Sequence, residues 1–344
     1  MAKNIVVLSD GTGQEGGEGV DSNVYKLFKM LLNRSPKQIV FYDSGVGTGW
    51  RKLGGRVGGA GISKNILECY RFIFDHYEAG DRIFMFGFSR GAATVRSLSG
   101  FIHRFGVLPK SRPELIEQAY GIYRISNDER RNEKVEGFHV RHHTMWTKDI
   151  FLGVWDTVAA LGAPINLPIK LMDKVPFFKH RFHDFELSRS VSRAYQALAI
   201  DDERKAFHPA LWDSEIQSYQ CMQQVWFCGM HTDVGGGRQE AGLSDIALEW
   251  MLAKAKDYGL ELYPEHEVPL EPSANGKMHD SREGLGRLYR KLARSWPADR
   301  TDRPVIHESV NDRKRGTDNS PDSPYEPWIL RDWSPKQEPP EPAD

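Results

Sequence analysis

Short apolar runs alternate with amphipathic segments along this chain. Ile5 to Leu8 is a continuous apolar run closed by Asp10 and Gly11, which is typical of a strand buried on both faces of a sheet. Similar runs predict further strands at 38–42, 82–86, 151–155 and 224–228. Apolar residues that recur every three or four positions predict helices at 23–32, 62–77, 113–127, 188–199 and 244–258, and small residues predict another from about Ala92. We therefore expect an α/β fold whose mostly parallel sheet carries helices on both faces.

Length and composition favour one large domain. The chain has 344 residues, of which 40% are hydrophobic, and this is enough for a sizeable core. We predict that residues 1–313 form a single domain, with helical or irregular cap elements at about 100–148 and 163–200. Residues 314–344 are rich in Pro, Asp, Glu and Ser, so we expect a mostly irregular tail that Trp328 and Trp333 could dock onto the core.

Charge and cysteine content exclude several classes of protein. The chain has 46 basic and 47 acidic residues, a net charge of −1, which argues against a nucleic-acid partner. Its three cysteines have no metal-binding spacing and indicate reduced thiols in a cytoplasmic protein. Neither a secretory signal peptide nor an apolar run of roughly 18 residues is visible, so we expect no transmembrane segment, and export only by a dedicated secretion system.

A Gly-x-Ser-x-Gly sequence, Gly87 to Gly91, follows the third predicted strand. In α/β-hydrolases this pentapeptide forms a sharp strand-to-helix turn, and its glycines relieve crowding around a strained serine that exposes its hydroxyl. The start of the following helix also favours negative charge. We therefore predict that Ser89 is a nucleophile. The alternative is a tight turn between strand and helix that carries no chemistry.

The loop after the first strand is a candidate oxyanion hole. Two strands precede the one that ends at Ser89, so the first corresponds to the third strand of a standard α/β-hydrolase, whose following loop supplies an oxyanion N–H group. In this chain that loop contains Gly11 and Thr12. The second donor is expected to be the backbone N–H of Arg90. Asp10 is expected to accept hydrogen bonds from amides of the loop.

Two later strand ends offer an acid and a base. The strand 151–155 ends at Asp156, and the strand 224–228 is followed by His231 in a glycine-rich loop. A hydroxyl nucleophile needs a base, and the base needs an orienting carboxylate. The usual α/β-hydrolase, however, has its acid after the seventh strand and its histidine on the next loop. By the predicted count, Asp156 follows the sixth strand and His231 the seventh.

A second set of residues fits the usual placement. Asp233 follows the seventh predicted strand, and either His279 or His307 could then be the base. Spacing alone leaves this set open beside Asp156 and His231. A buried aspartate at a strand end is often only a cap, and a histidine in a glycine-rich loop is often polar surface.

Neither a metal nor a cofactor is needed to explain these residues. Four of them follow strand ends and could in principle gather around Ca²⁺ or Mg²⁺, namely Asp10, Asp156, His231 and Asp233. The serine motif already accounts for such a site. The glycine-rich loop 44–61 lacks the G-x-G-x-x-G spacing of a dinucleotide site. We therefore expect no cofactor and no metal.

The segment 165–185 mixes apolar residues, among them Phe177 and Phe178, with lysines and arginine. Apolar groups beside cations suit contact with a lipid interface. The alternative is a cap that packs over the core and keeps its lysines in water.

Motifs along most of the chain carry a family resemblance. They are VVLSDGTG (6–13), GDRIFMFGFSRGAATVRSL (80–98), FLGVWDTVAALG (151–162), FHDFELSRSVSRAYQALAIDDERKAFHPALW (182–212), VWFCGMHTDVGGG (225–237) and IHESV (306–310). With these motifs in this order, the chain resembles the DUF2235 family, which includes the catalytic domain of the Tle1-type phospholipase effectors of type VI secretion. The resemblance covers roughly residues 4–312. It implies a serine esterase that acts on phospholipids, with Ser89, Asp156 and His231 as the triad.

Motif and resemblance together predict a serine carboxylic-ester hydrolase with an α/β-hydrolase fold, which works through an acyl-enzyme. The expected substrate is a lipid or phospholipid ester, with peripheral contact to a membrane. One alternative is a soluble short-chain esterase or other acyl hydrolase. An alternative of another class is a non-catalytic adaptor that retains the fold and binds a partner.

Overall fold

The structure is a computed structural model that describes residues 2–11, 17, 20–33, 35–45, 58–158, 186–263, 268–296, 304–316 and 325–330. At its centre is a seven-stranded parallel sheet in the order β2-β1-β3-β4-β5-β6-β7. The strands are β1 (Asn4–Ser9), β2 (Gln38–Asp43), β3 (Arg82–Phe88), β4 (Ile150–Trp155), β5 (Val191–Ala199), β6 (Cys221–Phe227) and β7 (Val305–Ile306). The prediction of a parallel α/β sheet is confirmed.

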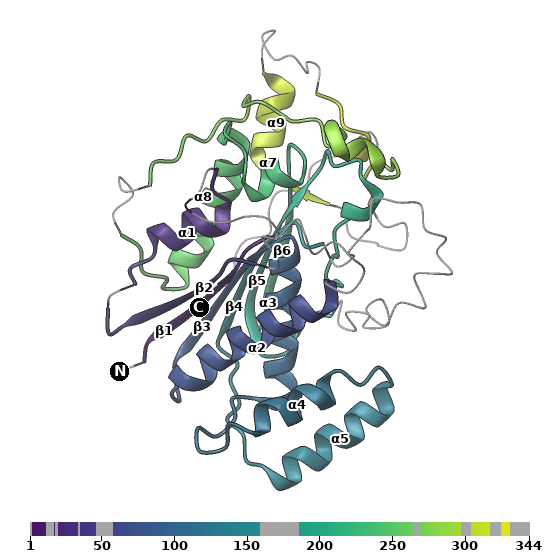
Figure 1. Cartoon of the computed structure of the whole chain (residues 1–344). Helices are drawn as coiled ribbons and strands as arrows, with labels where there is room; N and C mark the ends of the chain where they lie inside the picture. Colours follow the sequence, from purple (N-terminus) through teal and green to yellow (C-terminus); the bar gives the residue numbers. More distant parts are fainter. Residues whose placement is uncertain are drawn as a thin grey trace.

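Helices cover both faces of this sheet (Figure 1). One face carries α1 (Asn23–Met30), α8 (Gly242–Asp257) and the short α7 (His231–Gly235), and the other carries α2 (Gly58–His76) and α3 (Arg90–Phe105). The other helices are α4 (Leu115–Tyr123), α5 (Asp128–Arg141) and α9 (Glu308–Arg315). Short 3₁₀ turns lie at η2 (Lys205–Phe207), η4 (Gly284–Leu288) and η5 (Trp328–Leu330).

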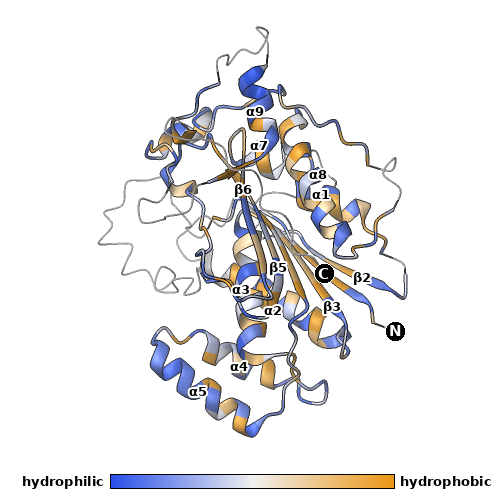
Figure 2. Cartoon of the chain, turned by 180° about the vertical axis from the view of Figure 1, so that it is seen from behind, coloured by the Kyte–Doolittle hydropathy of each residue, from blue (hydrophilic) through white to orange (hydrophobic). Residues whose placement is uncertain are grey.

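The central strands are apolar on both faces. Successive side chains of a strand point to opposite sides of the sheet. In β1, Val6 and Leu8 join the core beneath α1 and α8, whereas Ile5 and Val7 join the core beneath α2 and α3. Figure 2 shows the strands mainly in orange, whereas α5 is mainly blue. The continuous apolar run at the start of the sequence is thus the pattern of a parallel strand covered on both sides.

The segment 191–199 is a strand, so the helix predicted at 188–199 is wrong. β5 lies between β4 and β6 and pairs with both. Tyr195 and Ala197 enter one core, and Val191 and Ala194 enter the other. Alanine, glutamine and leucine favour helices in isolation, but pairing with two neighbouring strands overrides that preference.

This extra strand also corrects the predicted strand count. With β1 as the third strand of a standard α/β-hydrolase, β4 is the sixth, β5 the seventh and β6 the eighth. His231, just after β6, therefore lies on the loop where this fold usually has its histidine. Asp156 still follows the sixth strand. Asp233 follows the eighth strand and not the seventh, so the placement argument for it as the acid is lost.

The predicted cap at 100–148 is wrong, because α4 and α5 lie far from the carboxyl ends of the strands. α3 begins at the carboxyl end of β3 and runs back along the sheet. Val107, just after α3, then bridges to Met145, shortly before β4 begins. The excursion that contains α4 and α5 therefore lies at the amino ends of the strands, as Figure 1 shows. The cap predicted at 163–200 is also too long because it includes β5, and residues 159–185 lie outside the described ranges.

Part of the predicted irregular tail is ordered by docking. Tyr325 and Leu330 are buried in the same core as α8. The Tyr325 hydroxyl donates a hydrogen bond to Oδ2 of Asp201 at 2.8 Å. Trp328 begins η5, and Trp333 lies outside the described residues.

Candidate active site

β3 ends in a strained turn at Ser89. With φ of 56°, Ser89 is one of two described non-glycine residues with positive φ, and Asp156 is the other. The flanking glycines have no room for a side chain. A Cβ on Gly87 would lie 2.6 Å from the backbone of Gly91, and a Cβ on Gly91 would lie 1.9 Å from the carbonyl oxygen of Ser9. The pentapeptide therefore forms the sharp turn from strand to helix that exposes a serine side chain.

The loop after β1 lies beside Ser89, because a Cβ built on Gly11 would lie 3.6 Å from the Cβ of Ser89. The Gly11 amide donates to Oδ1 of Asp10 at 2.7 Å, so this predicted oxyanion donor is engaged within its own loop. Thr12 lies outside the described residues. Arg90 is the first residue of α3, and amides of a first helical turn have no carbonyl partner within the helix. The Arg90 amide therefore remains available as an oxyanion donor.

Asp10 organises the loop that borders Ser89. Besides the amide of Gly11, its carboxylate accepts hydrogen bonds from the hydroxyls of Ser22, at 2.5 Å, and Tyr42, at 2.9 Å. The Ser22 hydroxyl also accepts from the amide of Tyr25 and so caps α1. Burial raises the pKa of Asp10 to about 6, because the hydrogen bonds offset only part of the lost hydration.

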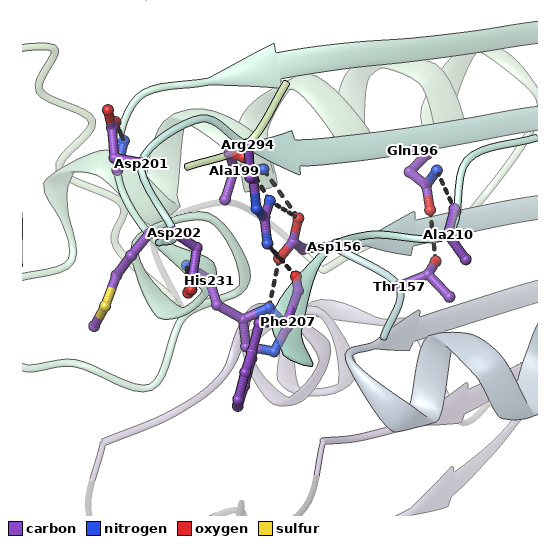
Figure 3. A network of polar contacts seen from close by, with 12 residues as sticks. Asp156, Thr157, Gln196, Ala199, Asp201, Asp202, Phe207, Ala210, His231 and Arg294 are labelled. Carbon is purple, nitrogen blue, oxygen red and sulfur yellow. Dashed lines mark hydrogen bonds and ion pairs between the residues drawn. The ribbon is translucent and has the colours of Figure 1, made fainter. Parts of the chain in front are cut away.

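Asp156 and His231 form a buried hydrogen-bonded pair (Figure 3). Nδ1 of His231 lies 2.5 Å from Oδ2 of Asp156, and both side chains are at most 5% exposed. Asp156 directly follows β4, and His231 is the first residue of α7. The His231 ring packs against Phe88, with 4.6 Å between ring centroids, and Phe88 directly precedes Ser89. The pair therefore lies against the turn that carries the serine.

The contacts of His231 determine which of its nitrogens can act as a base. Because Nδ1 faces a carboxylate, the neutral ring carries its proton there and leaves a lone pair on Nε2. Among the described residues, no hydrogen bond joins the Ser89 hydroxyl to His231. In serine hydrolases such bonds often tighten only when substrate is bound.

Arg294 completes the surroundings of Asp156, and sequence reasoning missed it. Its terminal nitrogens donate to the two carboxylate oxygens of Asp156 at 2.6 and 2.8 Å. They also donate to the carbonyls of Ala199 and Phe207, and the Ala199 amide donates to Asp156 at 3.0 Å. Burial opposes ionisation of Asp156, but the guanidinium and His231 hold the pKa of this carboxyl well below its usual range.

The loop after β5 holds the backbone and the ring of His231. The buried carboxylate of Asp202 accepts a hydrogen bond from the His231 amide at 3.3 Å and pairs with Arg204 at 2.6 Å. Burial would raise the pKa of Asp202, but Arg204 brings it below its usual value. Phe207 packs edge-on against the His231 ring, with 5.1 Å between centroids.

The sequence contains only weak signals for these supporting residues. Asp202 follows a strand end, as Asp156 does, but the strand before it was predicted as a helix. Arg294 lies in a polar stretch with several other cations, such as Arg290 and Lys291. Only its tertiary contacts distinguish it from those neighbours.

The alternative acid and bases make contacts of their own. Nδ1 of His279 lies 2.6 Å from Oδ1 of Asp233, and Nε2 of His279 lies 3.3 Å from a carboxylate oxygen of Glu240. His307 precedes α9 and caps it by accepting from the Ser309 amide. No described contact links His279 or His307 to Ser89 or Phe88.

Within the described ranges, no group of three His, Cys, Asp or Glu side chains is arranged to hold a metal ion. Asp156 and His231 pair with each other, whereas Asp10 bonds to Ser22 and Tyr42 and Asp233 bonds to His279. In the same ranges, no helix is both long and apolar enough to cross a membrane.

The model of the catalytic domain of Tle1-like phospholipase effectors of the type VI secretion system matches residues 3–254. This chain belongs to that family. The Tle1-like domain has the α/β-hydrolase fold, in which the sharp turn with Ser89 follows β3 and Asp156 and His231 follow β4 and β6.

Relatives of the Tle1-like domain are diverse. The uncharacterized protein YEL023C of Saccharomyces cerevisiae is 35% identical over a region that covers 35% of this chain and 20% of the yeast protein. The crystal structure of an uncharacterized Pseudomonas aeruginosa protein matches with 17% identity and a TM-score of 0.46, covering 80% of this chain and 49% of that one. The Tle1 effector, solved with the VgrG spike of the Type 6 secretion system, matches with 18% identity and a TM-score of 0.35. This match covers 69% of this chain and 52% of the effector chain. The chain thus spans a fifth of the yeast relative and about half of each of these two structures.

Proposed function

We propose that this protein is a serine carboxylic-ester hydrolase whose triad is Ser89, His231 and Asp156. The observation that carries the proposal is the buried Asp156–His231 pair, which packs against Phe88, the residue before Ser89. A serine hydroxyl in a strained turn beside an oriented imidazole is the arrangement that acyl transfer needs. Membership of a phospholipase effector family supports the same chemistry.

In this mechanism the Ser89 hydroxyl attacks the ester carbonyl while Nε2 of His231 accepts its proton. Asp156 stabilises the imidazolium that forms. The Arg90 amide donates to the tetrahedral oxyanion at the start of α3, where the helix dipole also favours negative charge. The imidazolium then protonates the leaving alkoxide, and the alcohol departs from the acyl-enzyme. A water molecule, deprotonated by His231, then attacks the acyl-enzyme. The imidazolium returns this proton to the Ser89 oxygen as the carboxylic acid leaves.

Exposed leucines near the catalytic pair support a lipid ester as the substrate. Leu285, Leu288 and Leu292 are 66%, 57% and 43% exposed. The same stretch contains Tyr289, whose ring packs edge-on against Phe207, itself in contact with the catalytic histidine. An exposed apolar surface so close to the chemistry suits a substrate that is presented in a lipid layer.

Cations are interspersed with these leucines. Arg287, Arg290 and Lys291 are exposed on the same stretch. Lys291 pairs with Glu203, whereas the guanidinium groups of Arg287 and Arg290 form no ion pair with another described residue. Apolar side chains mixed with exposed cations suit an anionic phospholipid surface. The predicted contact segment 165–185 lies outside the described residues, so this stretch is the surface on which we base the lipid proposal.

Fluorophosphonate labelling tests the serine mechanism. We expect peptide mapping to find the label on Ser89 of the wild-type protein. The Ser89→Ala variant, checked for wild-type circular dichroism and Tm, should lose labelling and at least about 10³-fold of kcat on a soluble ester. Labelling of another serine, or full activity of Ser89→Ala, would contradict the proposal. A wild-type protein with neither label nor esterase activity would favour the adaptor alternative.

A substrate comparison tests the lipid class. We expect the double variant Leu285→Ser/Leu288→Ser to hydrolyse phosphatidylglycerol vesicles about tenfold more slowly, because it loses apolar contact with the bilayer. Its rate on a soluble short-chain ester should not change. Val140→Ser is the matched control, since Val140 is 85% exposed on α5, at the other end of the sheet. A wild-type enzyme that cleaves only the soluble ester would instead support the short-chain esterase alternative.

A further inference from the structure

The guanidinium of Arg294 is enclosed within the catalytic region although it comes from a distant part of the chain. It lies 138 residues from Asp156 in the sequence, and its side chain is 1% exposed. Both of its terminal nitrogens reach the Asp156 carboxylate, and each also reaches a backbone carbonyl. Figure 3 shows the guanidinium on one side of this carboxylate, with His231 reaching the same carboxylate.

Each oxygen of Asp156 receives two donors. Oδ1 accepts from Arg294 and from the amide of Ala199, and Oδ2 accepts from Arg294 and from His231. The carboxylate therefore cannot turn without breaking several charge-assisted hydrogen bonds. A parallel, two-bond contact between guanidinium and carboxylate also defines the plane of the acid, which a single lysine contact does not.

The guanidinium is held as a cation where it lies. Burial alone would lower the pKa of Arg294, but the adjacent Asp156 more than compensates and raises it. A buried cation and a buried anion are tolerated only as a well-matched pair, and removal of one partner leaves an uncompensated charge. The pairing of these two groups is therefore a fixed part of the site.

We propose that Arg294 is a positioning residue, which clamps both oxygens of Asp156, keeps this acid as a carboxylate and fixes the orientation of His231. This inference rests on the proposed triad and adds a fourth member to it. Arg294 acts through Asp156 and does not touch the substrate.

The effect on pH follows from electrostatics. Burial raises the pKa of Asp156, and the Arg294 guanidinium is the main group that lowers it. Without Arg294, the pKa of Asp156 should rise, so this acid should lose its charge, and with it the stabilisation of the imidazolium, at a higher pH. Among the described residues, Asp201 and Asp202 on the loop after β5 also act on Arg294, and Arg204 pairs with Asp202. Arg313 on α9 and Asp233 on α7 act on Asp201, and all of these groups remain in both variants.

Two substitutions separate charge from geometry. Arg294→Lys keeps the charge but loses the two-bond contact, so we expect kcat to fall about tenfold. The acid limb of its pH profile, which is the fall of kcat/KM at low pH, should stay in place. Arg294→Met loses both, so we expect kcat to fall about 10–100-fold and the acid limb to move up by about one pH unit. KM for a soluble ester should be unchanged in both, because the side chain is buried away from substrate.

A double-mutant cycle tests whether Arg294 acts through Asp156. In an Asp156→Asn background, Arg294→Met should lower kcat by less than about twofold, because the group it positions is already altered. A full additional loss in that background would show an independent role and overturn the inference.

The variants also separate failure of this inference from failure of the proposed function. Missing fluorophosphonate label on wild-type Ser89 refutes the triad itself. If Ser89 is labelled but Arg294→Met keeps the wild-type acid limb, only the role of Arg294 is refuted. The same holds if Ser89 is labelled and Arg294→Lys keeps the wild-type kcat. If circular dichroism shows that Arg294→Met does not fold, Arg294→Gln, which is neutral but polar, replaces it in the pH measurement. The kcat of Arg294→Lys then tests whether the two-bond contact positions Asp156.

Discussion

The molecule contains two buried histidine–aspartate pairs that are alike locally and differ in their surroundings. In Asp156–His231 and in Asp233–His279, Nδ1 of the ring lies 2.5 and 2.6 Å from a carboxylate oxygen. All four side chains are at most 6% exposed. Judged by the contact between ring and carboxylate alone, either pair could be the acid and base of a hydrolase.

The surroundings of the first pair leave the ring available for chemistry. Side-chain donors, Arg294 and His231, hold the carboxylate of Asp156. None of the described contacts involves Nε2 of His231, and the ring lies against Phe88 next to the serine. This pair can therefore accept a proton from a neighbouring group.

The contacts of the second pair, Asp233–His279, indicate a structural role. Oδ2 of Asp233 accepts from the backbone amides of Met230 and His279, so it joins the start of α7 to a distant loop. Nε2 of His279 faces the carboxylate of Glu240. Since both ring nitrogens are engaged, the pair can stabilise the loop that carries His231 but has no free site for a substrate proton. A histidine–aspartate contact thus indicates catalysis only when one ring nitrogen is left available beside a nucleophile.

Replacing each histidine should give the largest contrast. We expect His231→Ala to lose about as much kcat as Ser89→Ala, and the double variant of these two to be no worse than either single, because members of a triad act as a unit. His279→Ala should keep kcat within about tenfold of wild type. Initial rates on a soluble ester, with Tm measured for each variant, give the comparison. A dead His279→Ala beside an active His231→Ala would reverse the assignment and make Asp233 the acid.

Replacing each aspartate should separate activity from stability. Asp156→Asn should lower kcat by about 10²–10⁴-fold, because the amide cannot stabilise the imidazolium. Asp233→Asn should leave kcat nearly unchanged and lower the free energy of unfolding by about 1–3 kcal/mol, because a buried acceptor is weakened. Ester kinetics and urea unfolding at neutral pH measure both. Similar losses of kcat in the two variants would mean that the second pair also takes part in catalysis.

Asp156→Asn should also change how stability depends on pH. The pKa of Asp156 is below its usual value of 3.8 in the folded protein, so its contribution to stability is present above that value and is lost as pH falls below it. Asp156→Asn should therefore weaken the dependence of Tm on pH below about pH 4. An acid unfolding profile with the wild-type slope would contradict this linkage.

Local motifs in the sequence were sufficient for part of the site. Gly87 and Gly91 flank Ser89 because a strained turn leaves no room for a Cβ, and that requirement is visible in five consecutive residues. The buried parallel strands were visible as apolar runs, because a strand covered on both faces has no polar side. The contact of Asp156 with His231 was one of two arrangements that spacing left open. The catalytic roles of these two residues remain a proposal.

Features that depend on neighbours in the chain can therefore be predicted from local patterns, namely the serine turn, the strands with apolar runs and the amphipathic helices. Features that depend on distant partners arise only when the chain folds. β5 is a strand because β4 and β6 pair with it on both sides, although its composition also suits a helix. Arg294 differs from the cations near it only because folding buries it against Asp156, and no local pattern encodes a contact between residues 138 positions apart.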